Sequence, residues 1–197
     1  MLVDTQTAGY VETNPHPIRL AVSDDLGRSR LTVLLRLLLA VPHLVWLYLW
    51  TIAAELASIV AWFAALFTGR VPDGLHAFLA AYLRYLTQVT AYVTLLADPF
   101  PGFAGASGYP VDVVIAPPQP QSRLVVFFRL LLAIPAWIVA SVLGAVLRVV
   151  AVLGWFVCLA TGRMPEGMRN LGSYCLRYEA QTYGYTLLLD DRYPSFS

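Results

Sequence analysis

The chain has 197 residues, of which 58% are hydrophobic and only 13% are charged, and its mean hydropathy is +0.65. Soluble domains are closer to half apolar and a quarter charged, so this composition predicts an integral membrane protein. The net charge of +1 argues against a nucleic-acid partner. The two cysteines give neither a metal-ligand spacing nor a disulfide framework, and we expect no cofactor.

Two copies of one motif organise the chain. Residues 36–42 read Arg-Leu-Leu-Leu-Ala-Val-Pro, and residues 129–135 read Arg-Leu-Leu-Leu-Ala-Ile-Pro, 93 positions later. The interval holds without a gap across the rest of the copy, and such self-similarity outweighs local signals. We therefore predict a flexible N-terminal tail (1–15), membrane repeat 1 (16–103), a flexible Gly/Ala/Ser linker (104–108) and membrane repeat 2 (109–197).

Each repeat begins with a predicted strand. Residues 17–22 alternate between apolar and polar side chains, and their counterparts, 110–115, are rich in β-branched residues. Turn-forming residues follow both segments, at 24–27 and 117–120. No basic segment leads into an apolar one before residue 28, so we predict no cleavable signal peptide.

The main apolar block of the first repeat covers residues 31–67. A helix of that length would measure about 55 Å, whereas the hydrocarbon core of a bilayer is about 30 Å thick. One interpretation is a transmembrane helical hairpin that turns near residues 50–51, where the second repeat has Gly144. The other is a short interfacial helix that ends at Pro42, followed by one long crossing over residues 43–67.

The arginines that flank the apolar blocks favour the hairpin. They are Arg28, Arg30, Arg36, Arg70, Arg123, Arg129 and Arg163. A hairpin puts all of them on one side, which the positive-inside rule identifies as cytoplasmic, whereas single crossings would divide them. We therefore predict a multi-pass protein of the bacterial inner membrane with both termini in the cytoplasm. Candidate contacts for anionic lipid headgroups are Arg30, Arg36, Arg123 and Arg129.

A repeat-equivalent loop follows each block. Its shared residues are Gly69, Arg70 and Pro72 in the first repeat and Gly162, Arg163 and Pro165 in the second. Glycine suits the end of a helix, and proline followed by an acidic residue suits the start of the next. Helix capping therefore explains the loop apart from its arginine, which the positive-inside rule covers, and a ligand-binding role is the alternative.

Residues 75–88 and 168–181 are predicted to form amphipathic surface helices, because the second segment is too polar to cross a bilayer comfortably. Aromatic and β-branched residues then predict strands at 92–96 and 185–189. The predicted fold is mainly α and integral to the membrane, and each repeat is strand, transmembrane helical hairpin, amphipathic surface helix, strand. An even number of crossings per repeat predicts a pseudo-two-fold axis along the membrane normal.

Glu55 and Arg148 are the charges placed most deeply in the apolar blocks, and they occupy the same position in the two repeats. Equivalent residues face each other near a two-fold axis, and a charge in lipid costs about 2.5–3.5 kcal/mol, which favours pairing. One interpretation is an intramembrane ion pair. In the other, both residues lie at the far tip of the hairpin, near headgroups and water, and never meet.

Several motifs in combination resemble a known family. They are the Ser-Arg-Leu start, the Arg-Leu-Leu-Leu-Ala-Ile/Val-Pro run, the Thr-Gly-Arg-x-Pro-x-Gly loop and the Leu-Leu-x-Asp-x-Tyr/Phe-Pro-x-Phe end. The chain resembles bacterial membrane proteins, common in high-GC Gram-positive bacteria, that share a domain of unknown function, here in two tandem copies. The resemblance covers nearly the whole chain, implies a membrane protein, and supplies no catalytic residue.

The sequence contains no nucleophile–base pair, metal-ligand cluster or glycine-rich phosphate loop, so we predict that it is not an enzyme. The leading hypothesis is a non-enzymatic accessory or scaffold subunit of a larger membrane complex, with membrane lipids and other membrane protein subunits as partners. The alternatives are a small transporter or channel, which the duplication and Glu55 with Arg148 suggest, and a protein that binds anionic lipids.

Overall fold

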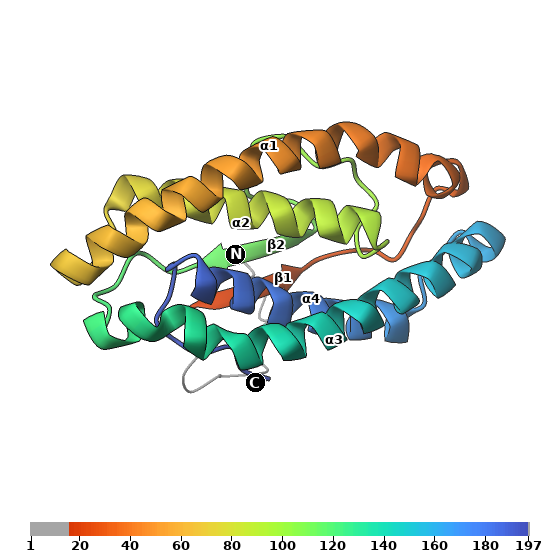
Figure 1. The fold of residues 1–197 in the computed structure, drawn as a ribbon. Helices are drawn as coiled ribbons and strands as arrows, with labels where there is room; N and C mark the ends of the chain where they lie inside the picture. The colour runs from red at the N-terminus through yellow and green to blue at the C-terminus, as the bar shows by residue number, and fades with distance from the viewer. Residues whose placement is uncertain (1–15, 197) are drawn as a thin grey trace, which may run out of the picture.

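A computed structural model describes residues 16–196, and the predicted N-terminal tail lies outside this range. Within it, two strands and four helices repeat one order of elements (Figure 1). They are β1 (Ile18–Val22), α1 (Arg30–Thr68), α2 (Asp73–Val93), β2 (Val111–Ile115), α3 (Arg123–Thr161) and α4 (Glu166–Thr186). The duplication seen in the sequence is therefore a duplication of strand, long helix and short helix.

Helices α1 and α3 are continuous over 39 residues each, so the predicted turn at residues 50–51 is wrong. The Thr51 hydroxyl bonds to the Leu47 carbonyl, one helical turn back, and Gly144 lies inside α3. Pro42 also lies inside α1, so the predicted interfacial helix does not end there. Neither Gly144 nor Pro42 ends its helix, because neighbouring elements pack against α1 and α3. At 1.5 Å per residue each long helix measures about 58 Å.

The predicted strands at 92–96 and 185–189 are also wrong. Helix α2 continues to Val93 and α4 to Thr186, and tight turns follow in which Leu95 and Leu188 adopt positive φ values of 65° and 60°. Tyr92 and Tyr185 stay helical because each ring packs against a buried arginine, and this tertiary contact overrides their strand preference. Each repeat therefore supplies one strand.

Strands β1 and β2 pair antiparallel, and the central pair of the ladder is Leu20 with Val113. These two residues occupy the same position in the two repeats. The ladder is extended symmetrically, because Ser23 N–H donates to the Pro110 carbonyl (2.8 Å) and Ala116 N–H donates to the Pro17 carbonyl (3.0 Å). The two repeats are thus joined through a single, self-complementary sheet.

The long helices run antiparallel and contact each other near both ends (Figure 1). The Trp62 indole of α1 donates to the Val126 carbonyl of α3 (2.8 Å), and the equivalent Trp155 of α3 donates to the Val33 carbonyl of α1 (3.0 Å). Helices α2 and α4 lie between α1 and α3, and the sheet packs against them, midway along the long helices (Figure 1). The sheet therefore lies far from the ends of the long helices α1 and α3.

Only a narrow stripe of each long helix is buried. In α1 it comprises Val33, Arg36, Ala40, His43, Ala54, Ala61 and Ala65. The remaining surface exposes large apolar side chains from Leu31 to Phe67, and Leu37 and Leu38 are each 70% exposed. Both α1 and α3 are long and apolar enough to cross a membrane.

Candidate functional site

A buried arginine forms the same structure in each repeat. Arg36 is 1% exposed; its Nη1 donates to the carbonyls of Tyr92 (2.6 Å) and Ala97 (2.8 Å), and its Nη2 to the Asp98 carboxylate (2.6 Å). The guanidinium also lies 4.5 Å from the centre of the Tyr92 ring. These contacts hold the turn that ends α2 against α1. We name this structure the arginine clasp.

Arg129 builds the second arginine clasp with equivalent partners. It donates to the carbonyls of Tyr185 (2.6 Å) and Asp190 (2.8 Å), to the Asp191 carboxylate (2.6 Å) and to the Gln121 side chain (3.1 Å). The prediction that Arg36 and Arg129 contact anionic lipid headgroups is therefore wrong. Both guanidiniums are buried, and their charge is balanced by an aspartate that closes the same repeat.

Arg30 and Arg123 remain exposed, at opposite ends of the molecule. Arg30 Nη2 donates to the Ala160 carbonyl (3.0 Å) at the end of α3, and Arg123 lies beside Gly69 at the end of α1. A cation at a helix C-terminus interacts favourably with its free carbonyls. Arg30 therefore caps α3, and the equivalent Arg123 places its charge beside the C-terminus of α1.

The repeat-equivalent loops cap helices as the sequence predicts. Gly69 and Gly162 follow α1 and α3 with φ values of +76° and +72°, and their N–H groups close the last turns. Pro72 and Pro165 stand directly before α2 and α4. In addition, the Gly162 carbonyl accepts a bond from Arg28 N–H, and the Gly69 carbonyl from Gln121 N–H. Arg70 pairs with Asp73 at the surface, while the backbone of Arg163 bridges to Gly27. These loops join the repeats.

Glu55 and Arg148 do not form an ion pair within residues 16–196. Both are exposed, and Glu55 lies close enough to Tyr82 on α2 to act on it electrostatically. Arg148 instead acts on Glu179, which lies on α4. Because α1 and α3 are separated by α2 and α4 at mid-length, equivalent residues there do not meet.

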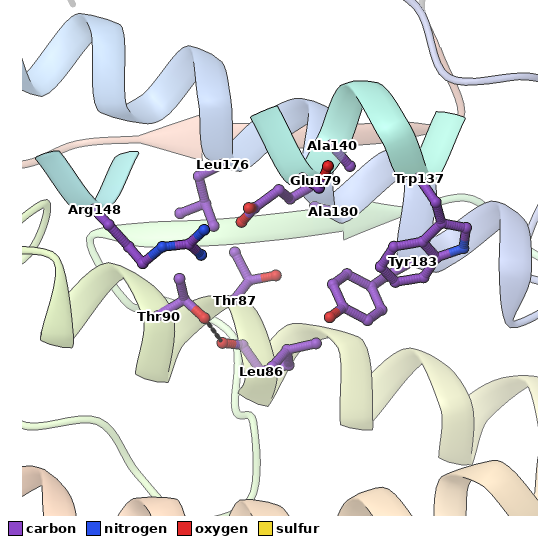
Figure 2. Close-up of a pocket in the computed structure, with 11 residues that line it drawn as sticks. Leu86, Thr87, Thr90, Trp137, Ala140, Arg148, Leu176, Glu179, Ala180 and Tyr183 are labelled. Carbon is purple, nitrogen blue, oxygen red and sulfur yellow. Dashed lines mark hydrogen bonds between the residues drawn. The ribbon is translucent and has the colours of Figure 1, made fainter. Parts of the chain in front are cut away.

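Arg148 and Glu179 project into one pocket of about 360 Å³ between α2, α3 and α4 (Figure 2). We name it the axial pocket. Its lining residues include Thr87, Thr90, Trp137, Ser141, Arg148, Glu179 and Tyr183. The pocket therefore combines one arginine, one carboxylate, hydroxyl groups and two aromatic rings with the aliphatic side chains of Leu86, Ala140, Leu176 and Ala180.

The surroundings of Glu179 in the axial pocket change the pKa of its carboxyl group. Burial raises its pKa from 4.5 to about 6, although the nearby Arg148 acts in the opposite direction. Gly144 makes room for this carboxylate, because a Cβ at that position would collide with Glu179 Oε1 and lie 3.4 Å from Arg148 Nη1. The glycine we interpreted as a helix bend therefore serves packing.

Two apolar grooves are built from equivalent residues of the two repeats. One, of about 460 Å³, is lined by the clasp residue Arg36, Leu37, Val93, Thr94, Leu95, Arg148, Ala151, Val152, Trp155 and Phe156. The other, of about 290 Å³, is lined by Ser58, Ile59, Trp62, Phe63, the clasp residue Arg129, Leu130, Thr186 and Leu188. We name them the Trp155 groove and the Trp62 groove. Arg148 lines both the Trp155 groove and the axial pocket, so these two spaces adjoin.

Sequence reasoning missed Glu179, Tyr183 and the two clasp aspartates. A signal for Asp98 and Asp191 was available, since each stands 62 residues after its arginine in both repeats. Glu179 has no counterpart, because the first repeat has Leu86 at that position. Within the described residues, no group of three or more His, Cys, Asp or Glu side chains is placed to hold a metal ion.

The family model of DUF4389, a domain of unknown function, matches residues 30–104 and 123–197. The chain belongs to this family. Each DUF4389 copy begins with a long helix, contains its own arginine clasp, and omits the strand that precedes it. No curated protein and no solved structure matches the chain.

Proposed function

We propose that this DUF4389 protein is a non-enzymatic scaffold or accessory subunit embedded in the bacterial cell membrane. The observation that supports this proposal is the apolar surface that α1 and α3 expose along their full length. Apolar patches of this extent are covered by lipid or by a partner. The buried guanidiniums of the two arginine clasps donate their hydrogen bonds within the chain and hold its elements together.

We further propose that α1 and α3 lie along the membrane and do not cross it. The reciprocal contacts support a pseudo-two-fold axis that passes between Leu20 and Val113, perpendicular to both long helices. With this axis along the membrane normal, the helices are parallel to the surface and the sheet faces water. If the helices crossed instead, the sheet would lie at mid-depth. Its outer edges and the exposed Arg19 would then face hydrocarbon, at a cost of about 2.5–3.5 kcal/mol for the arginine alone.

The arginines at the helix ends support the same arrangement. Arg30 and Arg163 lie at one end of the pair of long helices, and the equivalent Arg123 and Arg70 lie at the other. A crossing would put two exposed arginines on each side of the membrane, which gives the positive-inside rule no preferred direction. The length of about 58 Å also exceeds the hydrocarbon core of about 30 Å.

Labelling of single cysteines tests this orientation. In a variant without Cys158 and Cys175, a cysteine replaces either Arg70 or Arg163, in loops at opposite ends of the molecule. Intact and lysed cells are then treated with a membrane-impermeant maleimide. We expect both loops to be protected in intact cells and labelled after lysis. Labelling of one loop but not the other in intact cells would show that the long helices cross.

The scaffold role requires a partner. We expect a tagged full chain, extracted from native membranes in mild detergent, to carry a stoichiometric second protein that mass spectrometry identifies. Purification as a stable monomer without protein partners would contradict this part of the proposal, while leaving the membrane arrangement to the labelling experiment.

A further inference from the structure

The axial pocket opens on the face of the molecule opposite the sheet. On α2, Arg84 and Gln88 reach β2, whereas Thr90 lines the pocket. On α4, Gln181 bonds to the β1 backbone, whereas Glu179 lines the pocket. Residues two positions apart lie on opposite sides of a helix. In the proposed orientation the sheet faces water, so the axial pocket opens toward the hydrocarbon.

The two charges of the axial pocket have no fixed partner. Within the described residues, neither the Glu179 carboxylate nor the Arg148 guanidinium makes a hydrogen bond or a salt bridge, although both point into the same space (Figure 2). The clasp arginines, by contrast, each make at least three such bonds. Unpaired charges of opposite sign facing hydrocarbon are costly, so a ligand that carries both signs would relieve the cost.

The chemistry of the lining specifies the ligand. A guanidinium suits a phosphate, with which it forms directed hydrogen bonds. A carboxylate beside aromatic rings suits an ammonium group, and the rings of Trp137 and Tyr183 pack edge to face at 4.8 Å within the pocket. Where the pocket adjoins the Trp155 groove, the lining becomes almost entirely apolar, which suits an acyl chain.

We propose that the axial pocket and the Trp155 groove together bind one zwitterionic amino-phospholipid. Its phosphate lies against Arg148, its ammonium group against Glu179 beside Trp137 and Tyr183, and one acyl chain occupies the groove. The inference rests on the proposed function only in placing the chain in a membrane. A lipid in the same leaflet would then have its headgroup level with α2 and α4 and its chains directed to the bilayer centre.

The Trp62 groove is an internal control for this site. It has the same apolar lining, yet the position of Arg148 is occupied by Glu55 and that of Glu179 by Leu86. Glu55 does not line the Trp62 groove, and the guanidinium that does, that of Arg129, is buried and bonded within its clasp. The Trp62 groove therefore lacks the free guanidinium that Arg148 gives the Trp155 groove. Acyl chains of bulk lipid can enter both grooves, whereas selection by headgroup belongs to the Trp155 groove alone.

Quenching of single tryptophans separates the two grooves. Full-length variants that keep only Trp155 or only Trp62, with the other tryptophans replaced by phenylalanine, are purified in detergent. Phenylalanine keeps an aromatic ring at the Trp137 position beside Glu179. The variants are titrated with phosphatidylethanolamine or phosphatidylglycerol whose acyl chains carry bromine. We expect phosphatidylethanolamine to quench Trp155 at least tenfold more effectively than phosphatidylglycerol, and Trp62 to show no preference. Equal quenching of Trp155 by both lipids, or the same preference at Trp62, would overturn the proposal.

Charge variants in the Trp155-only background identify the groups. Glu179→Gln should abolish the preference of Trp155 quenching for phosphatidylethanolamine. Arg148→Gln should weaken the quenching of Trp155 by both lipids at least tenfold, and Arg148→Lys should restore part of it. Glu55→Gln, at the position equivalent to Arg148, should change neither the headgroup preference nor the strength of Trp155 quenching. Thermal unfolding establishes that each variant is folded. Unchanged selectivity in Glu179→Gln would overturn the assignment. The assay uses micelles, so its failure is distinguishable from failure of the membrane orientation or of the search for a partner.

Discussion

The two arginine clasps offer a comparison inside one molecule. Asp98→Asn and Asp191→Asn each remove the carboxylate charge opposite a buried guanidinium while keeping the shape of the side chain. Removing one member of a buried ion pair costs about 3–5 kcal/mol. The Asp98 and Asp191 side chains are 28% and 30% exposed, so water compensates part of that cost. Each arginine also keeps two carbonyl acceptors.

The remaining surroundings make the two substitutions unequal. Arg129 retains the Gln121 acceptor and the nearby charge of Asp190, whereas Arg36 has a second cation, Arg28, close enough to repel it. We therefore expect a loss in unfolding free energy of about 3 kcal/mol for Asp98→Asn and about 2 kcal/mol for Asp191→Asn.

Thermal unfolding in detergent measures the difference. For a protein of this size each kcal/mol corresponds to a change in Tm of about 2–4 °C, so we expect decreases of about 6–12 °C and about 4–8 °C. Arg70→Gln, which removes an exposed ion pair, is the matched control and should change Tm by less than about 2 °C. An unchanged Tm in Asp98→Asn, or a larger loss in Asp191→Asn, would refute the reasoning.

Three further outcomes follow from named contacts. The raised pKa of Glu179 means that the folded protein holds its proton up to about pH 6, above the ordinary value of 4.5, so stability should fall by up to about 2 kcal/mol between pH 4.5 and 7. Glu179→Gln should remove this slope in thermal unfolding. Trp62→Phe and Trp155→Phe should each cost about 1 kcal/mol by the same measurement, because each deletes one donor between the repeats. Gly144→Ala should displace the Glu179 carboxylate, cost about 1–3 kcal/mol and weaken phosphatidylethanolamine quenching.

The sequence predicted those features that depend on local pattern. The duplication, the first strand of each repeat, the existence of the short helices and the helix-ending glycines at 69 and 162 all follow from periodicity or turn chemistry. The predicted surface position of the short helices is wrong, because α2 and α4 are packed between α1 and α3 and are largely buried. The family assignment is also confirmed. The strands, helices and glycines depend on residues within a few positions of one another, and the duplication and the family are visible as repeated motifs, so none of these signals requires knowledge of the fold.

The errors share a cause in tertiary structure. The length of the apolar block suggested a turn, yet α1 stays continuous because α2 and α3 support it from end to end. Arg36 seemed free to reach lipid, since Asp98 stands 62 positions away and only the fold brings them together. Glu179 was not predicted as a site residue, because its place in the pocket depends on Arg148 and Gly144, which lie on another helix.

The pairing of Leu20 with Val113 has a consequence for how such a chain could arise. A register centred on equivalent residues is one that a single repeat could form with a second copy of itself, as in an isologous homodimer. Fusion of two copies turns that association into an intramolecular one. A homodimer, however, must carry the same residue on both sides. Only after fusion could one half hold Glu55 and Leu86 while the other acquired Arg148 and Glu179.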